Sequence, residues 1–231
     1  MHTHTGFRHS LVQRLGQLVL LGLWLVPAAH AVDWQESPQI AALFEGAGVT
    51  GTFVLHDVGA GSFIGHDRAR AERRFSPAST FKVANSLIGL TVGAVSGVDD
   101  PLPYTGPPEP FIKAWARDMG LREAIALSNV PIYQALARRI GPDRMRMQLA
   151  RLDYGNAETG DAVDRFWLDG PLRISAFEQA RFMARLAQGT LPLPETAQLA
   201  VRDILRLEQR PGWSLYAKTG WENAPGPGVG W

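Results

Sequence analysis

The chain has 231 residues, of which 45% are hydrophobic and 19% are charged, and its formal net charge is +1. This composition is that of an ordinary globular protein and argues against disordered and collagen-like classes. Since the chain has no cysteine, disulfides and cysteine-based catalysis or metal binding are excluded.

The first 31 residues predict a secretory signal peptide. Arg8 and Arg14 precede an apolar run over 15–26, and residues 29–31 (AHA) have the small-x-small pattern of a cleavage site. The apolar run is too short to span a bilayer comfortably, so we expect a periplasmic protein with no stable membrane anchor after cleavage; a retained anchor is the alternative. The remaining chain holds 21 basic and 22 acidic side chains, so we expect no nucleic-acid partner.

The segments that follow predict a β-hairpin and then one helix. Runs 50–58 and 62–67 are rich in β-forming residues and are joined by a Gly-Ala-Gly turn. From 79 to 90 the apolar residues recur at helical spacing. Residues 96–110 are rich in Gly and Pro and predict a long loop.

The rest of the chain predicts a block of helices and a final strand. Helices are expected at 111–119, 121–127, 131–140, 142–152, about 175–187 and 194–207. Ser175 and Glu178 have the spacing of a capping box. A strand over 213–217 then leads into Lys218. This order predicts an α+β domain over 32–231, with a helical subdomain over about 96–174.

Histidine is a poor candidate for the catalytic base. Outside the signal peptide only His56 and His66 remain, and both fall on strands of the predicted hairpin. A Ser-His-Asp triad or a zinc site would have to depend on these two residues. We therefore expect no metal site and a base of another type.

Lysine is the more informative residue. The chain has 20 Arg and only three Lys, which are Lys82, Lys113 and Lys218. Arginine does not lose its proton in proteins, whereas a desolvated lysine can do so and act as a base. Lys113 lies on an amphipathic stretch and is expected to be an ordinary surface residue.

Ser79 and Lys82 form a candidate nucleophile and base. They are three residues apart at the start of a predicted helix, so their side chains share one face. The free N–H groups of a first turn favour the negative charge that develops when a serine attacks a carbonyl. An apolar neighbourhood would lower the pKa of Lys82, as a base at neutral pH requires. A capping serine beside an ordinary lysine is the alternative interpretation of this pair.

The second motif strengthens the catalytic interpretation. Lys218, Thr219 and Gly220 form a K-T-G sequence after the predicted strand. S-x-x-K followed by K-T-G is the motif pair of penicillin-recognising serine enzymes. With the intervening residues, the chain closely resembles the class D, oxacillinase-type serine β-lactamases over nearly all of its length after the signal peptide. The resemblance rests on Ser79-Thr80-Phe81-Lys82, Ser128-x-Val130, Tyr154-Gly155-Asn156, Trp167 and Lys218-Thr219-Gly220.

The resemblance implies a fold and a small-molecule β-lactam substrate. The fold of that family is a mostly antiparallel sheet flanked by helices, with a helical subdomain. The implied reaction is β-lactam hydrolysis through an acyl-enzyme on Ser79. In the family the lysine corresponding to Lys82 is carboxylated by carbon dioxide or bicarbonate and serves as general base; no other cofactor is implied.

The resemblance also assigns roles to the remaining site residues. Trp167 would donate its indole N–H to the carboxylated lysine, and Val130 would keep that pocket dry. Ser128 would pass a proton to the leaving nitrogen with electrostatic support from Lys218. The remaining substrate contacts would come from the K-T-G segment: Thr219 would meet the substrate carboxylate, Gly220 would permit close approach, and the N–H groups of Ser79 and Trp221 would form the oxyanion hole.

The sequence departs from the family at its end. Family members continue past K-T-G through further strands, an arginine that pairs with the substrate carboxylate, and a C-terminal helix. This sequence stops at Trp231, so the resemblance implies an incomplete domain with the K-T-G strand at a sheet edge. The alternatives are a D,D-peptidase or transpeptidase, a β-lactam-sensing domain, and an inactive truncated fragment. The sequence makes no prediction of oligomeric state.

Overall fold

The strands nearest the N-terminus form a three-stranded sheet. In the computed structural model, which describes residues 1–2, 33–222 and 228–231, β2 (Phe53–Asp57) pairs antiparallel with β3 (Ser62–His66). This pairing confirms the predicted hairpin. On the other side of β3 lies β1 (Trp34–Glu36), which runs parallel to it and was not predicted. The sheet is therefore mixed rather than purely antiparallel.

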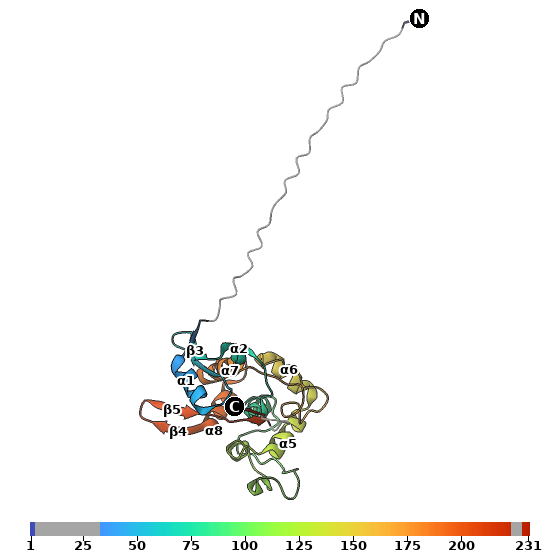
Figure 1. Cartoon of the computed structure of the whole chain (residues 1–231). Helices are drawn as coiled ribbons and strands as arrows, with labels where there is room; N and C mark the ends of the chain where they lie inside the picture. Colours follow the sequence, from blue (N-terminus) through green and yellow to red (C-terminus); the bar gives the residue numbers. More distant parts are fainter. Residues whose placement is uncertain (3–32, 223–227) are drawn as a thin grey trace. The chain divides into compact units, whose positions relative to one another are not determined.

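Helices are the main regular secondary structure of the described chain (Figure 1). The α-helices are α1 (Pro38–Ala47), α2 (Arg68–Glu72), α3 (Lys82–Thr91), α4 (Leu121–Ala126), α5 (Val130–Ile140), α6 (Pro142–Leu152), α7 (Ala176–Gln188) and α8 (Glu195–Leu205). Two 3₁₀ turns accompany them, η1 (Ala78–Phe81) and η2 (Lys113–Trp115). The remaining strands are β4 (Arg206–Arg210), β5 (Trp213–Tyr216), β6 (Trp221–Glu222) and β7 (Val229–Gly230).

Helix α3 occupies the centre of the core. Every residue from 82 to 89 is buried, and the helix packs against α5 and α8. Its apolar residues join those of α4, α5 and α6 in one hydrophobic cluster. Burial of this kind contributes about 1.5–3 kcal/mol for each large apolar side chain. The core therefore holds most firmly the helix that begins with Lys82.

Several helix boundaries follow directly from capping chemistry. Ser175 and Glu178 form the predicted capping box, and Gly189 ends α7 in the left-handed conformation. Asn129 caps α5 through a hydrogen bond from the N–H of Ile132. These local interactions explain why α5 and α7 begin within one residue of their predicted positions.

The helix predicted over 111–119 was wrong. Only the short turn η2 is helical there, and Met119 instead exchanges backbone hydrogen bonds with Leu102. The carboxylate of Asp118 accepts a further bond from the N–H of Tyr104. Tertiary pairing with 102–104 takes the backbone groups that a helix would need, so local apolar spacing was overridden.

Two other predicted helices have different ends. The helix predicted to begin at Ser79 starts as the 3₁₀ turn η1 and becomes α-helical only at Lys82. The helix predicted over 194–207 ends at Leu205, and the chain turns into β4, which pairs antiparallel with β5. Residues 206–207 form a strand because β5 is there to pair with β4, and local propensity does not report such pairing.

In the described part of the chain, the strands on either side of the K-T-G segment each have one neighbour, so they lie at sheet edges as expected. The strand before it, β5, pairs with β4, and β6 after it pairs antiparallel with β7. Gly220 and Trp231 exchange both backbone hydrogen bonds between these strands. The α+β class is confirmed, although the strands of the described residues form three separate small sheets.

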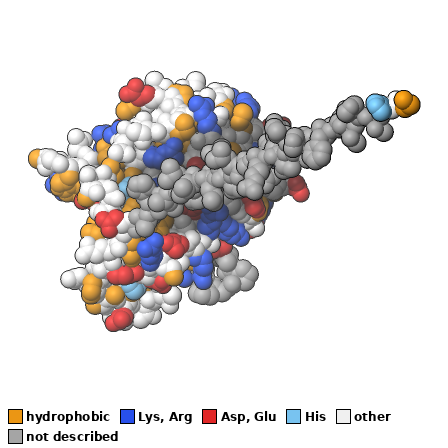
Figure 2. Space-filling model, turned by 90° about the horizontal axis from the view of Figure 1, so that it is seen from above, with side chains coloured by type: hydrophobic (Ala, Val, Ile, Leu, Met, Phe, Trp, Pro, Cys, Tyr) orange, Lys and Arg blue, Asp and Glu red, His pale blue; other side chains and the backbone are white. Residues whose placement is uncertain are grey.

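The predicted signal peptide lies outside the described residues, apart from residues 1–2. Among the helices of the described ranges, none is long and apolar enough to cross a membrane. On the face shown in Figure 2, basic and acidic side chains are interspersed, and neither sign gathers into one patch.

Candidate active site

Ser79 lies in the turn η1, directly before the buried helix α3. Its hydroxyl oxygen is 2.7 Å from Nζ of Lys82, within hydrogen-bond distance. The preceding residue, Ala78, has a left-handed φ of 46°, which is costly for a residue with a Cβ. Such backbone strain occurs where surrounding structure holds it, as the fully buried Phe81 and α3 do here.

The surroundings of Lys82 favour the uncharged form of its amine. The side chain is fully buried, with its amine over the ring of Tyr133 at 5.5 Å from the centroid. Burial holds the pKa of Lys82 well below its usual range, and the positive charge of Lys218 lowers it further. A neutral amine can accept the proton of Ser79, whereas a protonated one cannot.

Ser128 lies at the joint between α4 and α5. Its φ is 52°, and the N–H groups of Ser128 and Asn129 donate to the carbonyls of Ile125 and Ala124. This is a Schellman motif, whose left-handed position usually holds glycine. The next residue, Asn129, is already the cap of α5. The two-residue joint turns the Ser128 side chain into the pocket that also contains Ser79.

Gly220 brings the strand side close to the nucleophile. A Cβ at this position would lie 2.9 Å from the carbonyl oxygen of Pro77 and 3.0 Å from Cγ2 of Thr80. Because Gly220 and Trp231 form a hydrogen-bonded pair, the next pair, Trp221 and Gly230, does not exchange bonds. The N–H of Trp221 therefore points away from β7.

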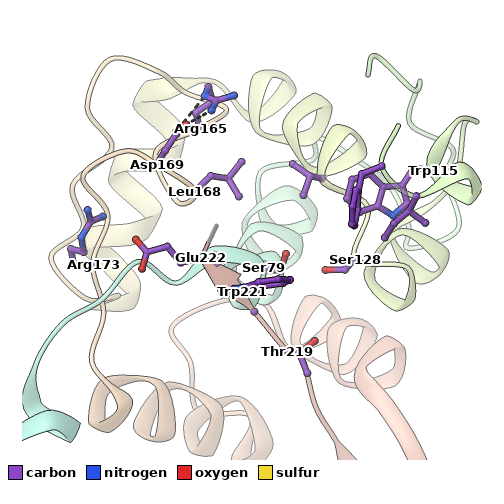
Figure 3. Close-up of a pocket in the computed structure, with 15 residues that line it drawn as sticks. Ser79, Trp115, Ser128, Arg165, Leu168, Asp169, Arg173, Thr219, Trp221 and Glu222 are labelled. Carbon is purple, nitrogen blue, oxygen red and sulfur yellow. Dashed lines mark hydrogen bonds and ion pairs between the residues drawn. The ribbon is translucent and has the colours of Figure 1, made fainter. Parts of the chain in front are cut away.

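The pocket at these residues has a volume of about 940 Å³. Six of the predicted site residues line it, and they are Ser79, Ser128, Val130, Thr219, Gly220 and Trp221. Figure 3 shows the hydroxyls of Ser79 and Ser128 turned toward one another, with Thr219 and Trp221 on the strand beside them. Residues almost 150 positions apart in the sequence thus share one cavity.

Three predicted site residues, Lys82, Trp167 and Lys218, do not line this pocket. Lys82 is buried beneath Ser79, and Trp167 is fully buried against Phe81, the residue before Lys82. The indole N–H of Trp167 is buried and has no hydrogen-bond partner among the described residues. Lys218 donates to the carbonyl of Thr219 at 2.8 Å, and burial lowers its pKa.

Other residues that line the pocket were missed in the sequence. Trp115 lies on one side of the pocket, and Arg165, Leu168 and Asp169 lie across from it (Figure 3). The pocket is also lined by Phe111, Ile112, Arg173 and Glu222. Arg165 and Asp169 form an ion pair. Trp115 was missed because the sequence analysis placed it in a helix. Had 111–119 been predicted as a loop, an aromatic residue there would have been a reason to consider Trp115 for the pocket.

The Tyr154-Gly155-Asn156 segment positions the loop that ends at Arg173. Asn156 accepts the N–H of Arg173 at 2.9 Å and donates to the carbonyl of Pro171 at 2.9 Å. Gly155 has a φ of 57°, and a Cβ there would lie 2.0 Å from the carbonyl oxygen of Arg173. This motif therefore fastens the loop that ends at Arg173 and carries part of the pocket wall.

The predicted histidines take ordinary structural places on the hairpin. His56 stacks on Phe63 at 4.1 Å between ring centroids, and His66 stacks on Phe44 at 4.9 Å. Neither lines the pocket of Ser79. Within residues 33–222 and 228–231, no group of three or more His, Asp or Glu side chains is arranged to hold a metal ion.

Comparison with known proteins agrees with this fold. Residues 51–230 match the penicillin-binding protein transpeptidase domain. The chain is 39% identical over 191 residues to β-lactamase OXA-5 of Pseudomonas aeruginosa, covering 81% of this chain and 71% of that protein. It is 37% identical over 203 residues to β-lactamase OXA-48 of Klebsiella pneumoniae, covering 88% and 76%.

Solved structures lead to the same family. The crystal structure of FUS-1 (OXA-85), a class D β-lactamase from Fusobacterium nucleatum subsp. polymorphum, matches with a TM-score of 0.80 at 42% identity, covering 82% of this chain and 78% of that one. A class D β-lactamase from Nostoc matches with a TM-score of 0.79 at 36% identity, covering 83% and 81%. The chain therefore belongs to the class D β-lactamases.

Proposed function

We propose that this chain hydrolyses β-lactams through an acyl-enzyme on Ser79, with Lys82 as general base. The observation that supports this most directly is the 2.7 Å contact between the Ser79 hydroxyl and a fully buried amine of lowered pKa. A serine hydroxyl becomes an effective nucleophile when a neighbouring group removes its proton. Arginine could not do so, which accounts for a lysine in a chain that otherwise prefers arginine.

Acylation forms a bond from Ser79 Oγ to the β-lactam carbonyl carbon and breaks the bond from that carbon to the ring nitrogen. The proton of Ser79 passes to Lys82, and Ser128 gives a proton to the departing nitrogen and regains one from the base. The N–H groups of Ser79, in the first turn of η1, and of Trp221, free of β7, stabilise the negative charge on the carbonyl oxygen.

The residues around Lys82 fit a carboxylated lysine. The uncharged amine is the form that reacts with carbon dioxide, and the unpartnered indole N–H of Trp167 is a donor for the oxygen atoms of the product. Carboxylation would supply an anionic proton acceptor for acylation and for the water that releases the product. Val130 limits water at this position, and Lys218 supports Ser128 electrostatically.

The substrate carboxylate has one candidate partner in the K-T-G segment. The exposed Thr219 lines the pocket beside Gly220, so its hydroxyl is available to donate to an anionic oxygen.

Export belongs to the same proposal. The three-part pattern of residues 1–31 supports a signal peptide and a periplasmic product. Sequencing the N-terminus of the mature protein should identify cleavage after Ala31, and an intact N-terminus would contradict it.

A transpeptidase or D,D-peptidase is the second candidate, because the matched family model describes a transpeptidase domain. The two functions differ in deacylation. Rapid turnover of a chromogenic cephalosporin, faster with added bicarbonate and lost in Ser79→Ala, supports the β-lactamase. A stable Ser79 adduct without turnover would contradict it and favour the peptidase or a sensing domain.

A further inference from the structure

The loop that carries Trp115 is fastened to the segment that carries Ser128 by two hydrogen bonds. The indole Nε1 of Trp115 donates to the carbonyl of Leu127 at 2.9 Å. In the opposite direction, the side-chain Nδ2 of Asn129 donates to the carbonyl of Trp115 at 3.1 Å. Ser128 lies between the two anchoring residues, so these bonds bracket it. We call this pair of bonds the Trp115–Asn129 clamp.

Asn129 is placed to control the backbone at Ser128. Its side chain is fully buried, and its Oδ1 accepts the N–H of Ile132 at 3.2 Å as the cap of α5. Its backbone N–H closes the end of α4 by donating to Ala124. One residue therefore joins α4, α5 and the Trp115 loop.

The joint needs such support because Ser128 is strained. A left-handed φ of 52° in a residue with a Cβ costs about 1–3 kcal/mol and persists only where the surroundings hold it. The two bonds of the Schellman motif hold the backbone from the side of α4. The clamp holds it from the side of the pocket wall.

We propose that Asn129 is a positioning residue for proton delivery by Ser128, acting through the Trp115–Asn129 clamp. The inference rests on the proposed function, since Ser128 must protonate the nitrogen that leaves during acylation. Asn129 itself does not line the pocket. Its effect is to hold the Ser128 hydroxyl at the distance and direction that proton transfer requires, and displacements of about 1 Å can cost about a hundredfold in rate.

Two substrate types separate this role from a structural one. A penicillin expels a basic nitrogen that needs a proton as the C–N bond breaks. In a cephalosporin whose 3′ substituent departs, the electron pair of that nitrogen is delocalised into the ring, so less proton delivery is needed. Misplacing Ser128 should therefore slow the acylation of penicillin more than that of the cephalosporin.

The test measures the single-turnover acylation rate of Asn129→Ser with both substrates. Serine is an equally good helix cap but is too short to reach the carbonyl of Trp115, so α5 keeps its cap while the clamp loses one bond. We expect the acylation rate to fall about tenfold with benzylpenicillin and less than about threefold with the cephalosporin. A tenfold fall is a modest part of what general acid catalysis contributes. Equal losses for the two substrates, or no loss, would overturn the proposal.

Two further variants complete the experiment. Trp115→Phe keeps an aromatic wall but removes the other bond of the clamp, and it should lower the penicillin-to-cephalosporin ratio in the same direction, with no further change when combined with Asn129→Ser. Gln198→Ser is the matched control, because Gln198 is a buried amide that bonds Leu191 and Leu193, and it should leave the ratio unchanged. If the unaltered protein acylates but turns over neither substrate, the proposed function fails, whereas a normal parent with unchanged ratios rejects only the clamp.

Discussion

On the helical side of the pocket, Ser79, Lys82 and Ser128 lie on segments that pack into the main hydrophobic cluster. On the strand side, the K-T-G segment follows a hairpin whose large apolar side chains are partly exposed to solvent. Phe81, beside Lys82, is completely buried. In the hairpin of β4 and β5, Trp213 is 53% exposed and Leu207 is 67% exposed. The difference shows that Lys82 and its helix are held by burial, while the K-T-G segment is held mainly by backbone pairing of its neighbouring strands and by the close approach of Gly220.

The contrast has a chemical reason. A lysine base works only where water is excluded, since burial is what lowers its pKa. A strand that contacts the substrate must instead face the solvent from which the substrate arrives. Changes on the helical side should therefore alter proton transfer, and changes on the strand side should alter substrate placement.

The largest expected effect is on the helical side, from Lys82→Arg. Arginine stays protonated and cannot become a neutral base, so the acylation rate should fall by at least about a thousandfold. Lys113→Arg is the matched control, because Lys113 is exposed and outside the pocket. Single-turnover kinetics with a chromogenic cephalosporin measures both, and activity retained by Lys82→Arg would refute the assignment of the base.

Ser128→Gly should change activity and stability in opposite directions. Loss of the hydroxyl should lower the acylation rate for a penicillin by about a hundredfold. Since glycine adopts a left-handed φ without a Cβ penalty, the free energy of unfolding should rise by about 1 kcal/mol. Ser128→Ala should lose the same activity without gaining stability, as measured by urea unfolding; equal stability of the two variants would show that Ser128 is unstrained.

On the strand side, Gly220→Ala should displace substrate contacts without touching the base. The new Cβ would meet the backbone of Pro77 and the side chain of Thr80, pushing the strand away from η1. We expect a ten- to hundredfold loss in kcat/KM. Gly230→Ala is the control on the paired strand β7, because a Cβ at Gly230 meets no atom within 4 Å. A similar loss in both variants would indicate general disruption of β6 and β7.

The smallest expected effect links the two sides through charge. Lys218 lowers the pKa of Lys82, so Lys218→Gln should let that pKa rise toward its usual value. A larger share of Lys82 is then protonated at a given pH, so the fall of the acylation rate on the acid side of its pH profile should move to higher pH. Lys218→Arg keeps the charge and should leave the pH profile unchanged. An unchanged pH profile in Lys218→Gln would show that burial alone lowers the pKa of Lys82.

Local signals in the sequence predicted the parts of this protein that depend on near neighbours. Alternation around a Gly-Ala-Gly turn predicted the hairpin of β2 and β3, and the capping box at Ser175 predicted α7. The three-residue spacing of Ser79 and Lys82 predicted their contact, because one helical turn brings such side chains together whatever surrounds them. The family resemblance predicted that Ser128 and the K-T-G segment share their pocket.

What failed depended on pairing partners outside the segment itself. The segment 111–119 had helical spacing, but Met119 pairs with Leu102, and Trp115 lines the pocket. Residues 206–207 became part of β4, where Arg206 pairs with Tyr216 of β5 and Leu207 lies at a register shift. The charged pocket residues Arg165, Asp169 and Arg173 had no local signature at all.

The chain's residue types by themselves indicated lysine as the candidate base, since arginine and the two hairpin histidines are chemically or positionally unsuited to that role. Only the tertiary structure shows that Lys82 is fully buried. It also shows that the backbone of Ser128, at the joint between α4 and α5, has a left-handed φ. The reason is physical. Functional groups are set by residue identity, but pKa and direction depend on burial and on backbone contacts between segments distant in sequence.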